Sequence, residues 1–225
     1  MTNCHRQGLI GIRHSVIHSS FVIRHSAFAA TAAFTIIELL VVISIIIVLA
    51  GLILGTSGYV QKKGARSRAE AEIAALSAAC ESYKADNGLY PRDNPGNNYT
   101  DSLDARSDGS VGVTYQHASQ YLYGQLNGDL NFDGQTDANA RSYFNFKPQM
   151  LGRGNNSLPP SGSNPVNYIR DPFGNSYGYS TAYQADIAAG TNPPRRGYNP
   201  TFDLWSTAGT TTASAADQAQ WIKNW

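Results

Sequence analysis

The sequence lacks the residue patterns that most enzymes and nucleic-acid-binding proteins share. Its 225 residues carry a formal net charge of +1 and form no Lys/Arg-rich cluster, which argues against a dedicated nucleic-acid binder. Four of its five histidines lie before residue 34, so His117 stands alone in a polar segment without a nucleophile motif nearby. The sequence contains no Gly-x-Ser-x-Gly elbow, no zinc or metalloprotease pattern, and no P-loop or dinucleotide fingerprint. We therefore expect a protein that is not an enzyme.

Proline is absent from Phe34 to Tyr90, and charge is nearly absent from the first part of that stretch. The apolar run from Phe34 to Leu54 has about 21 residues and would span roughly 30 Å as a helix, the thickness of a bilayer core. A secretory signal peptide has a shorter apolar core of about 7–15 residues. The run contains one carboxylate, Glu38, which costs several kcal/mol in lipid unless a partner neutralises it.

The residues Ala33-Phe34-Thr35-Ile36-Ile37-Glu38 resemble the prepilin signature of type IV pilins and type II secretion pseudopilins. The resemblance implies that a prepilin peptidase cuts between Ala33 and Phe34 and methylates the new amino group of Phe34. It also implies that Glu38 pairs with the N-terminal amine of a neighbouring subunit during filament assembly, which makes both charges tolerable in an apolar layer. The family usually has Gly before the cut, so we expect slower cleavage after Ala33. An ordinary single-span anchor fits the same length but gives no reason for Glu38.

Residues 1–33 would then be a leader with a degenerate repeat, in which Ile12-Arg13-His14-Ser15 recurs as Ile23-Arg24-His25-Ser26. Two interpretations stay open: a basic cytoplasmic leader, or a misassigned translation start that adds part of this stretch. Removing the leader takes Cys4 away and leaves Cys80 alone, so the mature chain has no intramolecular disulfide. We expect Cys80 to behave as a small buried apolar residue.

From residue 55 to residue 88 the pattern changes from apolar to amphipathic. Apolar side chains recur every three or four residues and predict a buried helix face formed by Ala69, Ile73, Leu76, Cys80 and Tyr83. Asn87-Gly88 followed by Pro91 is a helix stop, because Gly readily takes the left-handed C-cap conformation. We therefore expect one long helix from about Phe34 to about Asp86. Its first half, residues 34–54, would lie in the membrane or filament core, and its second half would pack on a head.

The head is expected in two parts. Residues 89–165 are rich in Asn, Asp, Gly and Ser and predict a loop-rich region with one short helix from about Ser119 to Leu126 and a linker from Gly152 to Pro165. Residues 166–225 contain short aromatic and polar runs that are typical of strands: Tyr168–Arg170, Ser176–Ser180 and Phe202–Ser206. The predicted fold class is α+β, a long N-terminal helix packed on a small antiparallel β-sheet head.

Several segments of the head resemble the major pseudopilin of type II secretion systems: Tyr83–Pro91, Asp171–Tyr179, Phe202–Ser206 and Trp221–Trp225. The resemblance implies a filament subunit that polymerises with itself through its N-terminal helix and drives protein export. Its partners would be the prepilin peptidase, minor pseudopilins and an inner-membrane assembly platform. It would cross the bacterial inner membrane once and hold its head in the periplasm. The alternatives are a minor pseudopilin or type IV pilus subunit, or a membrane-anchored surface protein that binds calcium or glycan and never polymerises.

Calcium is the one cofactor that the sequence suggests, at two places. Residues 129–137 alternate oxygen ligands and have Gly at the sixth position, as in an EF-hand-type loop; the ligands would be Asp129, Asn131, Asp133, the backbone carbonyl of Gln135, and Asp137. The twelfth position, where a bidentate acid is expected, is Ala140, and a solvated turn is the alternative. Major pseudopilins generally bind calcium after the last strand. Residues 207–214 hold no carboxylate here, so only Asp203 and Asp217 remain as candidate ligands.

Overall fold

The computed structural model describes residues 34–92, 98–109 and 112–225. The chain forms two compact units, Met1–Gly51 and Leu52–Trp225, and helix α1 (Ile36–Asn87, 52 residues) contributes residues to both. Ala33 and the rest of the expected leader lie outside the described residues. The long helix predicted from about Phe34 to about Asp86 is therefore confirmed, with its ends within two residues of the expected ones.

In the first unit, the described residues are the start of α1 and the two residues before it. Its apolar side chains are exposed throughout, Ile36 by 87% and Ile47 by 65%. Within the described part of the chain, α1 is the one helix that is long and apolar enough to cross a membrane. An apolar surface of this length is unfavourable in water and is typical of a helix that a bilayer covers.

In the second unit, the later part of α1 buries one face. Ala69, Ile73, Leu76 and Cys80 are buried as the spacing predicted, and Tyr83 is half-buried at the edge of this face. Cys80 is a free thiol whose pKa is raised by burial. The helix ends where expected, with Gly88 in the left-handed conformation at φ +78°.

Two small antiparallel sheets build the rest of the core. Strand β1 (Leu151–Arg153) pairs with β2 (Val166–Ile169), and β4 (Asp203–Ser206) lies between β3 (Gly178–Ser180) and β5 (Ile222–Lys223). The apolar side chains of these strands pack with the buried face of α1 in one cluster that includes Leu76, Ile169, Tyr179 and Leu204. The predicted α+β class is confirmed. The linker expected from Gly152 was placed too early, because Gly152 and Arg153 belong to β1.

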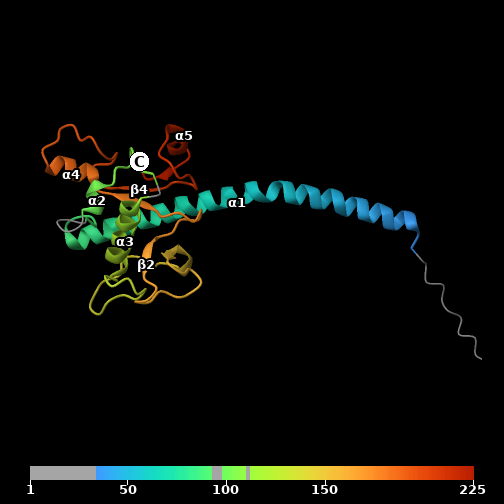
Figure 1. Cartoon of the computed structure of the whole chain (residues 1–225), viewed down its shortest axis with the longest axis horizontal. Helices are drawn as coiled ribbons and strands as arrows, with labels where there is room; N and C mark the ends of the chain where they lie inside the picture. The colour runs from blue at the N-terminus through green and yellow to red at the C-terminus, as the bar shows by residue number, and fades with distance from the viewer. Residues whose placement is uncertain (1–33, 93–97, 110–111) are drawn as a thin grey trace, which may run out of the picture. The chain divides into compact units, whose positions relative to one another are not determined.

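The second unit also contains shorter helices: α2 (Tyr99–Ser102), α3 (Val113–Asn127), the 3₁₀ turn η1 (Pro148–Met150), α4 (Ala182–Ala188) and α5 (Ala215–Gln218). The helix expected over Ser119–Leu126 is nearly twice as long as predicted and packs against β2 and β3 (Figure 1). The reason is that Tyr115, Ala118, Leu122 and Leu126 form one buried face at helical spacing. Gly128, at φ +68°, ends the helix.

Candidate functional site

Phe34 and Glu38 lie at the start of α1, and Thr35 connects them. The backbone N–H of Thr35 and its hydroxyl each donate to Glu38 Oε2 at 2.9 Å, and the Glu38 N–H donates to Thr35 Oγ1 at 3.3 Å. This reciprocal pattern is a capping box, which satisfies N–H groups that a helix start otherwise leaves without acceptors. Phe34 is 84% exposed, directly before the cap.

The capping role of Glu38 was missed at the sequence level, although the signal Thr-x-x-Glu was present from Thr35 to Glu38. Both hydrogen bonds fall on Oε2. Among the described residues, Oε1 receives no donor, so the carboxylate can accept an ammonium without losing its cap. The same side chain can therefore order the first turn of its own helix and carry a charge available to another molecule.

The helix face that follows Glu38 is shallowly grooved. Ile36, Leu40, Ile43 and Ile47 line a hollow of about 420 Å³ together with Leu39 and Ser44. Their spacing of three and four residues places them along one side of the helix. Such a groove receives apolar side chains or acyl chains, which suits either a bilayer or a packed helix from another copy.

The loop of the first expected calcium site follows α3 and is closed by its own hydrogen bonds. Asp129 is buried, and its Oδ2 accepts from the Tyr123 hydroxyl at 2.7 Å and from the Gly134 N–H at 2.8 Å. Asp133 Oδ1 accepts from the Gln135 N–H at 2.9 Å, and Asp137 Oδ2 accepts from the Leu130 N–H at 2.9 Å.

Two further observations bear on calcium in this loop. Asn131 lies among the other expected ligands: its Oδ1 accepts from the Asp133 N–H at 2.9 Å, and its Nδ2 donates to Asp137 Oδ1 at 3.2 Å. The described residues contain no group of three or more acidic, His or Cys side chains gathered as metal ligands. The loop is thus ordered by its own side chains, and calcium binding stays a prediction.

The second pair of candidate ligands is not brought together by a shared contact. Asp203 is buried in β4 and accepts from the N–H groups of Tyr198 at 2.8 Å and Asn199 at 2.9 Å. Asp217 accepts instead from the hydroxyls of Thr212 and Ser214 near α5, which lower its pKa. Burial raises the pKa of Asp203. Each carboxylate holds its own loop.

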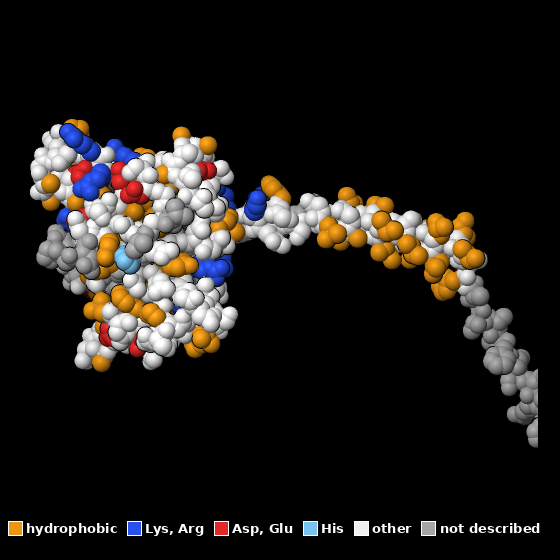
Figure 2. Space-filling view, viewed as in Figure 1, with side chains coloured by type: hydrophobic (Ala, Val, Ile, Leu, Met, Phe, Trp, Pro, Cys, Tyr) orange, Lys and Arg blue, Asp and Glu red, His pale blue; other side chains and the backbone are white. Residues whose placement is uncertain are grey.

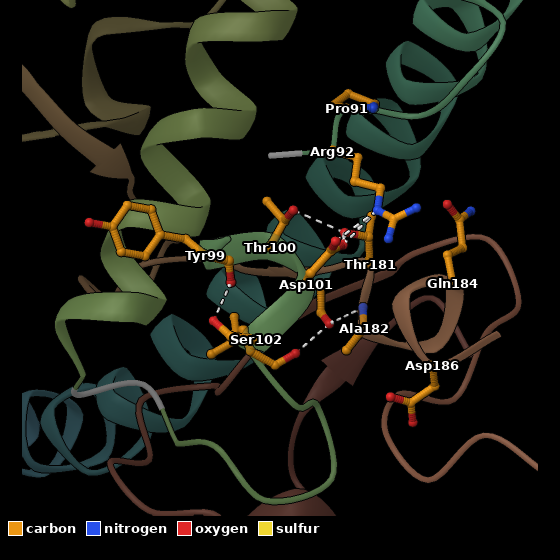
Figure 3. A network of polar contacts seen from close by, with 12 residues as sticks. Pro91, Arg92, Tyr99, Thr100, Asp101, Ser102, Thr181, Ala182, Gln184 and Asp186 are labelled. Carbon is orange, nitrogen blue, oxygen red and sulfur yellow. Dashed lines mark hydrogen bonds and ion pairs between the residues drawn. The ribbon is translucent and has the colours of Figure 1, made fainter. Parts of the chain in front are cut away.

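A polar network that the sequence did not reveal holds α2 against α4 (Figure 3). Arg92 Nε donates to both oxygens of buried Asp101 at 2.8 and 2.9 Å, and the Thr181 hydroxyl donates to Asp101 Oδ1 at 2.6 Å. Arg196 donates from Nη1 to the Asp101 carbonyl at 2.7 Å and pairs with Asp186, whose pKa it lowers. The network links segments distant in sequence, which is why no local pattern predicted it.

Comparisons with known proteins give no relative to set beside this geometry. No family model, curated protein or solved structure matches the chain. The structure by itself shows an architecture consistent with a pilin-like fold: a long apolar N-terminal helix whose later part packs on small antiparallel sheets.

Proposed function

We propose that the protein is a structural filament subunit of the pilin-like kind, with the major pseudopilin of a type II secretion-like system as its closest functional model. A prepilin peptidase would cut between Ala33 and Phe34 and methylate Phe34. The mature subunit would sit in the bacterial inner membrane with its head in the periplasm. It would leave the bilayer by polymerising with other copies, on an assembly platform and with minor pseudopilins, to drive protein export.

The observation that carries the proposal is the single carboxylate at the beginning of a membrane-length helix. Glu38 stands in an otherwise uncharged apolar run and keeps Oε1 open beside its capping bonds to Thr35. A carboxylate in this layer costs roughly 3 kcal/mol without a partner, and an N-terminal ammonium of another subunit offsets that cost. A plain membrane anchor would gain only the helix cap from such a residue, and that cap does not need a charge.

The capping box makes a sharp test available, because charge and cap can be separated. Glu38→Gln keeps a residue that serves well at the third position of a capping box but removes the negative charge. Thr35→Ala removes the two cap hydrogen bonds that the Thr35 hydroxyl makes, and it keeps the charge and the bond from the backbone N–H. We expect Glu38→Gln to stay in the membrane without forming filaments, whereas Thr35→Ala still assembles. Filaments are measured by electron microscopy and by sedimentation of sheared material.

Three results would contradict the proposal. Normal assembly of Glu38→Gln would show that no charge pairing is needed. Loss of assembly in both variants would show that assembly depends on the structure of the first helical turn and not on the charge of Glu38. A native protein whose N-terminus is not N-methylated Phe34, read by intact mass and N-terminal sequencing, would leave an anchored surface protein that does not polymerise.

A further inference from the structure

The second unit carries a basic pocket close to the end of the apolar run. It has a volume of about 440 Å³ and is lined by Tyr59, Lys62, Lys63, Arg66, Phe173, Ala208 and Gln220. Figure 2 shows Lys and Arg side chains gathered where α1 meets the rest of this unit. The pocket combines an apolar wall with a cationic rim, and no carboxylate lines it.

Two of the three cations have no anionic partner. Arg66 lies 3.4 Å from Glu70 and donates to the Gln220 carbonyl at 2.9 Å. Lys62 and Lys63 are exposed, and neither forms an ion pair with any residue that the structure describes. Glu72, further along α1, is already paired with Arg68, whose Nε lies 2.7 Å from Glu72 Oε1. Both ammonium groups are therefore available to an external anion.

The apolar wall is built by rings and a methyl group. Tyr59 is 71% exposed on α1, while Phe173 and Ala208 come from the loops before β3 and after β4 and pack partly on the core. The backbone N–H of Phe173 donates to Asp171 Oδ1 at 3.0 Å, which holds the backbone of this residue in place. A ligand that fits such walls and such a rim is amphipathic, with a negatively charged head.

The position of the pocket along α1 indicates which amphipathic anion lies near it. Leu54 ends the apolar run, so Tyr59 lies about 8 Å and Lys62 about 12 Å further along the helix axis. The polar layer of a bilayer adds about 5–8 Å on each side of its hydrocarbon core. Tyr is typical of that layer, and Lys just beyond it bends back to reach phosphates.

We propose that this pocket binds the headgroup of an anionic phospholipid in the outer leaflet of the membrane that α1 crosses, and so orients the head on the bilayer before assembly. Lys62 and Lys63 pair with the lipid phosphate, while Tyr59 and Phe173 lie against its glycerol and upper acyl chain. The proposal rests on the membrane anchoring within the proposed function and does not need polymerisation.

The test uses the full chain in nanodiscs of phosphatidylcholine alone or of an equal mixture with phosphatidylglycerol. Hydrogen exchange over residues 58–68 is measured by mass spectrometry. We expect exchange to slow about fivefold or more in the anionic discs, and we expect high salt to reverse this. The double variant Lys62→Gln/Lys63→Gln should lose the difference, and Lys62→Arg/Lys63→Arg should keep it.

A matched control removes two exposed positive charges elsewhere on the head, as Lys147→Gln/Arg195→Gln, and should behave as the unchanged chain. Equal exchange in both lipids, or undiminished protection in the Gln variant, would overturn the inference and leave the proposed function standing. Protection by inorganic phosphate in neutral discs would show that the pocket binds free anions and not a lipid. Protection that arises only after filaments form would show that a second copy of the chain occupies the pocket. A chain that fails to enter nanodiscs would overturn both proposals.

Discussion

The hydroxyl of Ser206 donates a buried hydrogen bond of 2.5 Å to Asp171 Oδ2, which ties strand β4 to the turn before β3. Oδ1 of the same carboxylate accepts from the N–H groups of Phe173 at 3.0 Å and Asn175 at 2.8 Å. Asp171 is 3% exposed, so water cannot take over from its carboxylate as the acceptor for these donors. Asp171 therefore holds the turn before β3 together and also joins that turn to the sheet.

Replacing Asp171 by Ala should lower the free energy of unfolding by about 3 kcal/mol, because a buried hydroxyl and two N–H groups lose their acceptor. Urea denaturation of the full chain in detergent, followed by tryptophan fluorescence, measures this change. Asp171→Asn is the control, because its amide oxygen still accepts from the turn, and it should cost less than half as much. A change in Asp171→Ala within about 0.5 kcal/mol of zero would show that the turn does not depend on the carboxylate.

Asp171 should also make stability depend on pH in an unusual direction. Burial raises its pKa from the ordinary value of 3.8, and the hydrogen bonds from Ser206 and the turn offset this only partly. A raised folded-state pKa means that the folded chain binds the proton more tightly, so this contribution is complete below 3.8 and is lost as pH rises through the folded value. The stability of the wild type relative to Asp171→Asn should therefore increase on acidification from neutral pH.

Asp186 should show the opposite slope. Hydrogen bonds from Arg196 lower its pKa below 3.8, so its contribution is present above that value and is lost as pH falls through the folded pKa. The difference in melting temperature between wild type and Asp186→Asn should shrink on strong acidification. A difference that stays constant down to the lowest pH at which the chain folds would show that the charge on Asp186 contributes nothing.

The sequence alone predicts α1 well, because its signals are local. An unbroken apolar run, a helical spacing from Ala69 to Cys80 and a Gly stop at residue 88 each act within a few turns. Strands β2, β3 and β4 are also found, since aromatic residues alternate in short runs between turn residues, whereas β1 and β5 were not predicted as strands. The predicted helix at α3 was too short, because the first turns of α3 are polar on the outside. The burial of Tyr115 in these turns depends on Trp205, which lies on the sequence-distant strand β4 with its ring centroid 5.6 Å from that of Tyr115.

In the candidate site, too, residues that follow from a local motif could be predicted, and residues that only the fold brings together could not. Phe34 and Glu38 follow from a local motif, and so does the cap by Thr35 once it is recognised. The network of Arg92, Asp101 and Thr181 joins residues up to 80 positions apart from Asp101, and only the fold brings them together. For the same reason no pattern in the sequence placed Phe173 beside Lys62.

Gly178 should tolerate no side chain. It pairs with Trp205 across β3 and β4, and an added methyl group would come within 2.3 Å of the Trp205 ring. Since Trp205 is fully buried, the ring cannot move into solvent, and Gly178→Ala should cost about 1–3 kcal/mol of stability or more. Gly154→Ala is the matched control, because its nearest neighbour would be Asn164 Oδ1 at 3.8 Å. Equal stability of the two variants in urea would contradict this close approach.

The predicted calcium loop can be tested without disturbing its fold. Asp133→Asn keeps an oxygen to accept from the Gln135 N–H but removes a charge that calcium needs. If residues 129–137 bind calcium, a hundredfold excess over Kd should stabilise the wild type by about 2.7 kcal/mol, seen as a higher melting temperature in calcium than in chelator. Asp133→Asn should lose most of this gain, and Asp217→Asn should keep it. The reverse result would place calcium beside α5 instead, and a wild type indifferent to millimolar calcium would leave the loop as a turn closed by Asp129 and its own backbone.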